Sequence, residues 1–268
     1  MSYSIITKDL HHLSNPEKAR ILSGFFKTGK GQYGEGDIFL GIPVPQSREI
    51  AKRYIEADVK TIQELLESKI HEHRLVALLI LVEKFKKANE KNRKLIVNFY
   101  LKNTNFINNW DLVDLSADKI LGEYLLGRSF ASPRSSEKPR FSEIPKSFGF
   151  REFQKAALFE NFDKEKSLLY KLAKSRNLWE KRMAIISTFA FIKRNRFKET
   201  FKITKLLLEE KHDLIHKACG WMLREVGKRN QKEAERFLQK YHKKMPRTML
   251  RYAIERFDEK KKGFYMRR

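Results

Sequence analysis

The sequence has only one cysteine, Cys219, among its 268 residues. A lone thiol excludes an internal disulfide and is typical of a protein from a reducing compartment. The sequence also lacks an uninterrupted apolar run of about 18 residues, the length that a membrane-spanning helix needs. Its first twenty residues, MSYSIITKDLHHLSNPEKAR, lack the apolar block that follows the basic start of a signal peptide. These absences predict a cytoplasmic protein with no membrane partner.

Acidic residues are the minority among the charged side chains. The chain has 57 Lys and Arg residues against 33 Asp and Glu residues, which gives a formal net charge of +24. This excess predicts a polyanionic partner, and nucleic acid fits best because each neutralised phosphate releases a counterion. An anionic membrane surface is the weaker alternative. Because 41% of the residues are hydrophobic, the chain has enough apolar material for a core, and disorder is not expected.

Strand patterns of useful length are also missing, and most of the sequence has the spacing of helices. Residues 47–103, for example, have apolar residues every three or four positions, with charged residues between them. The last two of three similar stretches are offset by 35 residues (217 − 182), a period typical of stacked helix pairs. The alternative is that any amphipathic helices look alike. The pattern predicts an all-α fold, an α-solenoid with a concave binding surface. The three stretches are RLVALLILVEKFKK from Arg74, RMAIISTFAFIKRN from Arg182 and KACGWMLREVGKRN from Lys217.

Two segments interrupt the helical pattern. Residues 24–41 contain six of the twelve glycines and predict a turn-rich connector between helices at about residues 27–41. Glycine loops can bind phosphates, but this segment lacks the GxxxxGK[ST] pattern and a preceding strand, so a plain connector is favoured. Residues 127–150 contain three of the seven prolines and many serines, and they predict an exposed loop inserted between helices.

The stretch FINNWDLVDLSA, at residues 106–117, places an indole and two carboxylates close together in this basic chain. On a helix, Trp110 and Asp114 are about one turn apart and project from the same face. Asp111 is rotated by about 100° from Trp110 and is expected to serve the helix itself. These residues alone leave two interpretations open. Either Trp110 belongs to the core and Asp114 pairs with a surface lysine, or both belong to a functional site.

Five stretches in chain order carry a further signal: NPEKA (15–19), FLGIPVPQSR (39–48), NNWDLVD (108–114), NLWEKRMAI (177–185) and KACGWMLREVGK (217–228). These stretches resemble the AlkD family, bacterial DNA glycosylases built from HEAT-like repeats. The resemblance implies an α-solenoid of HEAT-like (ARM-type) repeats with a concave basic groove, formed by a single domain over residues 1–268. The family's WDxVD, WxxR and GWxLRE motifs place four residues of this chain along the DNA-facing groove: Trp110, Asp114, Arg182 and Trp221. The five stretches occur in the family's order and span most of the chain.

The resemblance also implies an activity, the removal of 3- or 7-alkylpurines from duplex DNA, and the four residues suit that chemistry. A purine alkylated at a ring nitrogen is cationic, so it leaves without a general acid and the sugar becomes positive, as in glycoside hydrolysis. Asp114 would stabilise that charge and orient the attacking water. Trp110 and Trp221 would hold the cation against their ring faces, and Arg182 would bind a backbone phosphate. We therefore expect a monofunctional, metal-independent glycosylase that needs no cofactor.

Other basic residues are candidates for DNA contacts. Arg224 belongs to the GWxLRE motif, whereas Lys193, Arg194, Lys228 and Arg229 end two of the similar helices. These four would contact phosphates or complement helix dipoles. We expect a monomer, associated with the nucleoid, that binds duplex DNA mainly through its phosphate backbone. The alternative is a non-catalytic HEAT-like protein that recognises bent, branched or damaged DNA by its shape.

Overall fold

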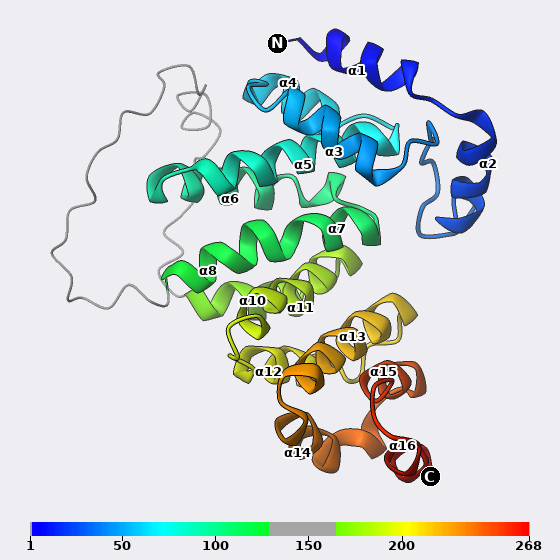
Figure 1. Cartoon of the computed structure of the whole chain (residues 1–268), viewed down its shortest axis with the longest axis vertical. Helices are drawn as coiled ribbons and strands as arrows, with labels where there is room; N and C mark the ends of the chain where they lie inside the picture. The colour runs from blue at the N-terminus through cyan, green and yellow to red at the C-terminus, as the bar shows by residue number, and fades with distance from the viewer. Residues whose placement is uncertain (1, 129–164, 268) are drawn as a thin grey trace, which may run out of the picture. The chain divides into compact units, whose positions relative to one another are not determined.

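The computed structural model describes residues 2–128 and 165–267, so the predicted insertion at about residues 127–150 lies almost wholly outside the described residues. The described chain is built of helices joined by short connections (Figure 1). Its only β structure is an isolated parallel bridge between Ile38 and Ile70. The predicted all-α class is confirmed. None of the described helices is long and apolar enough to cross a membrane.

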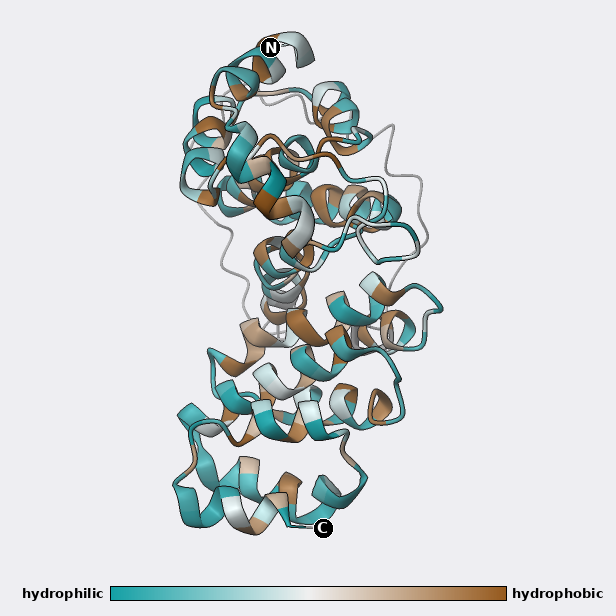
Figure 2. Cartoon of the chain, turned by 90° about the vertical axis from the view of Figure 1, so that its right-hand side faces the viewer, coloured by the Kyte–Doolittle hydropathy of each residue, from teal (hydrophilic) through white to brown (hydrophobic). Residues whose placement is uncertain are grey.

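The described residues separate into two compact units. Unit 1 contains residues 2–116, and unit 2 contains residues 117–128 and 165–267. Each unit buries its own set of apolar side chains. Hydrophilic and hydrophobic residues alternate around many of the helices (Figure 2), as their amphipathic spacing predicts. The assignment of residues 1–268 to a single repeat domain stays a prediction.

In unit 1, the long helix α5 lies at the centre of the packing. It packs against α3 and α4, and its residues 75–82 are all buried. Side-chain caps start three of the helices, because Asn15, Asp58 and Asn89 each accept a hydrogen bond from a backbone N–H three residues later. The helices are α1 (Tyr3–His12), α2 (Pro16–Phe25), α3 (Val44–Arg53), α4 (Val59–Leu66), α5 (His71–Lys87), α6 (Glu90–Lys102), the 3₁₀ helix η1 (Thr104–Phe106) and α7 (Trp110–Ala117), which ends at the boundary between the units.

The glycine-rich connector, residues 27–41, joins α2 to α3 without forming a helix. Gly41 has a φ of 82°, and a Cβ there would lie 2.2 Å from the carbonyl oxygen of Asn15. Only glycine fits this position, because a side chain would meet both backbone strain and a clash. The end of the connector is tied to α5, since the buried Glu72 carboxylate accepts hydrogen bonds from the backbone N–H groups of Leu40, Gly41 and Ile42.

In unit 2, α11 packs against α13, and α13 packs against α15. Gly220 allows the close approach of α13 and α15, because a Cβ there would lie 2.5 Å from the carbonyl oxygen of Met249. The stretches that resemble one another in sequence lie on α5, α11 and α13, the three longest described helices. The elements of unit 2 are the π-helix η2 (Asp118–Gly122), α8 (Glu123–Arg128), α10 (Glu165–Ala173), α11 (Leu178–Ile192), α12 (Lys198–Leu206), α13 (Asp213–Arg229), α14 (Gln231–Tyr241), the 3₁₀ helix η3 (His242–Lys244), α15 (Arg247–Ala253) and α16 (Glu259–Met266).

Candidate functional site

Trp110 is the first residue of α7, and the residue before it fixes the start of that helix. The side-chain oxygen of Asn109 accepts a hydrogen bond of 2.8 Å from the Trp110 N–H, and the Asn109 carbonyl accepts one of 3.2 Å from Val113. The Asn109 side-chain amide also donates to Asp37 over 3.3 Å. Asn109 is fully buried, so buried hydrogen bonds fix the backbone position that carries the indole.

Two phenylalanines flank the indole of Trp110. The ring of Phe26 stacks on it with centroids 5.0 Å apart and planes 14° apart, and the ring of Phe25 meets it edge-on at 5.8 Å. Phe26 is buried, whereas Phe25 is 61% exposed and Trp110 is half-buried. Unit 1 therefore presents an aromatic surface made of a supported indole and an exposed phenyl ring.

The two carboxylates of the WDLVD stretch have different surroundings. Asp114 follows Trp110 by about one helical turn and is half-buried. Asp111 is buried, and its Oδ1 accepts a hydrogen bond of 2.8 Å from the Leu112 N–H. Its Oδ2 lies 2.7 Å from Nε2 of His71. Asp111 therefore belongs to the interior of unit 1, and Asp114 is the more accessible of the two.

His71 is the centre of a buried cluster of charged groups that includes Asp111, the residue after Trp110. Its Nε2 meets Asp111, and its Nδ1 lies 3.3 Å from Oδ2 of Asp37 in the connector. The other carboxylate oxygen of Asp37 lies 2.7 Å from the guanidinium of Arg74. The four side chains, including that of Asp111, are between 2% and 10% exposed. Two acidic and two basic groups thus face one another away from solvent.

The charges of the buried cluster stabilise one another. Burial by itself would lower the pKa of His71, but the Asp111 carboxylate and the hydrogen bonds to Asp111 and Asp37 raise it to about 9. Burial would likewise raise the pKa of Asp37, yet the His71 hydrogen bond and the positive charges of Arg74 and His71 hold it below its usual value. At neutral pH Asp37 is therefore a carboxylate and His71 a cation.

Arg182, expected at the DNA-facing surface, is a buried residue of α11. It is 5% exposed, and its Nη1 donates to the backbone carbonyl of Leu214 at the start of α13. The structure therefore shows Arg182 linking two helices of unit 2, and its contact with a phosphate stays a prediction.

Trp221 lies on α13 and is half-buried. Its indole N–H donates to Glu225 over 3.2 Å, and its ring lies 6.1 Å from that of Phe189 on α11. Of the four predicted catalytic residues, α7 thus carries Trp110 and Asp114, and unit 2 carries Trp221 with Arg182. Convergence of all four on a single concave site stays a prediction.

The five other predicted DNA-binding residues lie at or near the surface of unit 2, and most of them meet carboxylates. Arg224 pairs with Glu255, and Lys228 lies 2.7 Å from Glu225. Lys193 lies 3.2 Å from Asp118, Arg194 lies 3.8 Å from Glu123, and Arg229 is exposed. Partly exposed pairs of this kind contribute about 0–1 kcal/mol each, so phosphates can compete for these cations.

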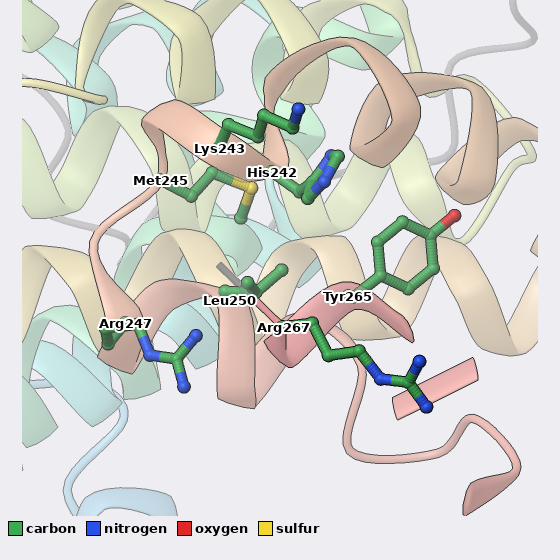
Figure 3. A pocket seen from close by; sticks show the side chains of 7 residues that line it. All are labelled: His242, Lys243, Met245, Arg247, Leu250, Tyr265 and Arg267. Atoms are coloured by element: carbon green, nitrogen blue, oxygen red, sulfur yellow. The ribbon is translucent and has the colours of Figure 1, made fainter. Parts of the chain in front are cut away.

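A basic cavity of about 500 Å³ lies near the end of the chain, among η3, α15 and α16. Lys243, Arg247 and Arg267 line it together with Met245 and Leu250, and Figure 3 shows the two apolar side chains between Lys243 and Arg247. The cavity includes none of the predicted site residues. Over residues 2–128 and 165–267, no group of three or more His, Cys, Asp or Glu side chains is arranged to hold a metal ion.

Sequence reasoning missed the partners that hold Trp110 in place. Phe25, Phe26 and Asp37 lie more than 70 positions before it, and His71 lies 39 positions before it. No spacing rule connects such distant residues. The available signals were local, namely an aromatic pair beside the glycine-rich connector and a polar run at the start of an apolar helix.

Comparisons with known proteins agree with this architecture. Residues 6–138 and 151–257 match the family model described as DNA alkylation repair enzyme. A solved structure described as a "Predicted DNA alkylation repair enzyme from Enterococcus faecalis" is similar to 92% of this chain over 97% of its own, with a TM-score of 0.63 and 15% sequence identity. At that identity the likeness shows the fold alone. No curated protein matches the sequence.

Proposed function

Because the chain belongs to the DNA alkylation repair enzyme family, we propose that it is a monofunctional, metal-independent DNA glycosylase acting on duplex DNA. Its substrates are cationic N-alkylated purines, the 3- or 7-alkylpurines, whose N-glycosidic bond it hydrolyses. The same proposal includes a monomeric protein of the cytoplasm, associated with the nucleoid, that binds DNA mainly through backbone phosphates. It also includes a fold of HEAT-like repeats.

The observation that supports this proposal best is the arrangement of Trp110 and Asp114 on α7. A half-buried indole, stacked on Phe26, stands about one turn before a half-buried carboxylate. In a protein of net charge +24, phosphates are attracted to the surface generally, whereas this pair offers a site for a cation. An alkylpurine and the sugar that it leaves behind are both cationic.

The chemistry follows from where positive charge develops. As the alkylated base departs, the sugar takes on oxocarbenium character. The Asp114 carboxylate stabilises that charge and orients the water that attacks the sugar. The ring faces of Trp110 and Trp221 attract the cationic base by about 0.5–2 kcal/mol each, depending on desolvation. No general acid is needed, because the leaving base is already positively charged.

Unit 2 supplies the DNA-binding part of the proposal. Arg224, Lys228 and Arg229 on α13, with Lys193 and Arg194 after α11, contact phosphates and release counterions. Arg182 contributes a further phosphate contact. These contacts position the duplex without reading its sequence.

The experiment is a base-release assay on duplex DNA that contains 7-methylguanine. Asp114→Asn removes the charge but little volume, and it is expected to slow base release by about 10²–10³-fold, the usual effect of losing one preorganised electrostatic contact. Binding to undamaged duplex is expected to stay near the wild-type affinity. The matched control is Asp258→Asn, because Asp258 is the exposed N-cap of α16 and asparagine caps a helix equally well.

Two results would contradict the proposal in different ways. Full base release by Asp114→Asn would remove Asp114 from the catalytic role while leaving the glycosylase activity in place. Wild-type protein that binds DNA with steep salt dependence yet releases no base would instead establish the non-catalytic DNA-binding alternative.

A further inference from the structure

The proposed reaction uses Asp114 and leaves the neighbouring carboxylate, Asp111, without a chemical role. The Asp111 side chain belongs instead to the buried cluster, with its Oδ2 2.7 Å from Nε2 of His71. A buried ion cluster is costly to build, because each charge must leave water and regain its interactions inside the protein. This cluster holds both sequence neighbours of Trp110, because Asp111 belongs to it and Asn109 donates a hydrogen bond to Asp37.

His71 connects two segments that lie far apart in the sequence. Its Nδ1 side faces Asp37, in the glycine-rich connector, and its Nε2 side faces Asp111, in the first turn of α7. The Asn109 side chain closes the arrangement, since it donates to Asp37 and accepts from the Trp110 N–H. Connector and helix start are thus joined through groups that are almost fully buried.

The ring of His71 also belongs to the aromatic stack that supports the indole. It stacks on Phe39 with centroids 4.5 Å apart, and it lies 5.1 Å from the ring of Phe26. Phe26 in turn stacks on Trp110. The connector folds back onto Phe26. A Cβ at Gly34 would lie 2.4 Å from the Phe26 carbonyl oxygen, which shows how closely the two backbones approach.

A second buried histidine on the same helix shows that burial alone does not create this arrangement. His73 is 1% exposed, and its ring meets Ser68 at 3.0 Å and the rings of Tyr3 and His11 edge-on. It makes none of the contacts of the buried cluster. Burial, with the charges of His11 and Arg74, lowers the pKa of His73 to about 4, so at neutral pH it is uncharged.

We propose that His71 is a positioning residue for the candidate site: by bridging Asp37 and Asp111, it fixes the glycine-rich connector to the start of α7 and holds the Trp110 indole in place. The charged groups that face its ring are Asp37 from the connector, Asp111 from α7 and Arg74 from α5. The importance of this position for base removal rests on the proposed function. The coupling of His71 to Trp110 does not.

The coupling can be measured with 5-fluorotryptophan and ¹⁹F NMR on the full chain. The three tryptophans give one resonance each, and Trp110→Phe identifies that of Trp110. His71→Gln is expected to shift the Trp110 resonance and to leave that of Trp221 in place. In the wild type, the Trp110 resonance is expected to titrate with a midpoint near the His71 pKa of about 9. That titration is expected to be absent in His71→Gln.

The matched control is His73→Gln, a substitution of the same type at a buried position two residues along α5. It is expected to leave the Trp110 resonance and its titration unchanged. An unshifted Trp110 resonance in His71→Gln, or an equal shift in His73→Gln, would overturn the proposal. If His71→Gln does not fold, the wild-type titration decides: a midpoint near 9 supports the proposal, and its absence overturns it.

Base release links the coupling to function. Because a misplaced group in an active site can slow a reaction severely, His71→Gln is expected to lower the single-turnover rate by about 10-fold or more. DNA affinity is expected to stay unchanged. Wild-type rates in His71→Gln would show that Trp110 needs no such positioning. A wild type that releases no base would contradict the proposed function, while the ¹⁹F result would still decide the positioning role.

Discussion

Asp111 and Asp114 stand three positions apart on one short helix, yet they face different surroundings. Asp111 is buried beside His71, whereas Asp114 is half-buried. At helical pitch, residues three apart are near neighbours on the surface, so small rotations decide which of them reaches the interior. The WDLVD stretch therefore combines a structural carboxylate, which pairs with His71, and a candidate catalytic one.

The titration of His71 predicts a pH-dependent stability. Its pKa is raised from 6.5 to about 9 in the folded protein. The resulting stabilisation is on the order of 3 kcal/mol, is fully present below the unfolded pKa and is lost as the pH rises through the folded value. The free energy of unfolding, measured in urea from pH 6 to about pH 10, should therefore decline more steeply in the wild type than in His71→Gln.

His71→Gln serves as the control for the wild type in that experiment, because the two proteins share all other titrating groups. Parallel curves for the two proteins would mean that the pKa of His71 is not raised in the native state.

At the scale of elements, the start of α5 organises unit 1. Its first four residues are polar and buried, and each side chain meets different partners. Glu72 receives three backbone N–H groups at the end of the connector, over 2.9, 2.8 and 3.2 Å. Peptide N–H groups that are buried without an acceptor are costly, so this carboxylate satisfies a segment that has no helix or sheet of its own.

Glu72→Gln tests how much these three hydrogen bonds contribute to the free energy of unfolding. Glutamine keeps one acceptor oxygen and brings an unneeded amide donor, so at least one N–H loses its partner. We expect unfolding in urea to become easier by about 1.5–3 kcal/mol. The matched variant is Glu83→Gln on the same helix, whose partner is the exposed Lys86 and whose loss should cost only about 0–1 kcal/mol. Equal effects of the two substitutions would mean that Glu72 is no more than a surface charge.

At the scale of the whole molecule, the basic residues outnumber the acidic residues that could pair with them inside the protein. Four of the five basic residues predicted to bind DNA near the ends of α11 and α13 meet carboxylates on the protein. In the proposed function, DNA binding at these residues would exchange weak internal pairs for phosphate contacts. The net gain comes largely from counterions that the duplex releases.

Salt dependence tests this exchange. Each lost phosphate contact should reduce the slope of log affinity against log salt by about 0.9, so Lys228→Gln and Arg229→Gln together should reduce it by about 2. Affinity at low salt should fall for all sequences alike. The control is Lys60→Gln, since the side chain of Lys60 is 84% exposed on α4 and belongs to no predicted site. A slope that changes as much in the control as in the double variant would argue for diffuse attraction without defined contacts.

The sequence by itself determined the features that depend on near neighbours or on composition. Apolar spacing predicted an all-α chain, and caps such as Asn15 and Asp58 lie where the helices begin. Charge predicted a polyanionic partner, and short motifs resembled a family to which the chain belongs. These signals are readable because helix formation and net charge depend on local spacing and on sums over residues.

Only the tertiary structure decided which distant side chains meet. Asp37, His71 and Asp111 share one buried cluster although they come from a loop and two different helices. The motif of Arg182 predicts a DNA contact, and the structure shows its side chain buried against the Leu214 carbonyl. Such pairings depend on how helices pack and on which charges lose water together, and neither is encoded in the spacing of residues along the chain.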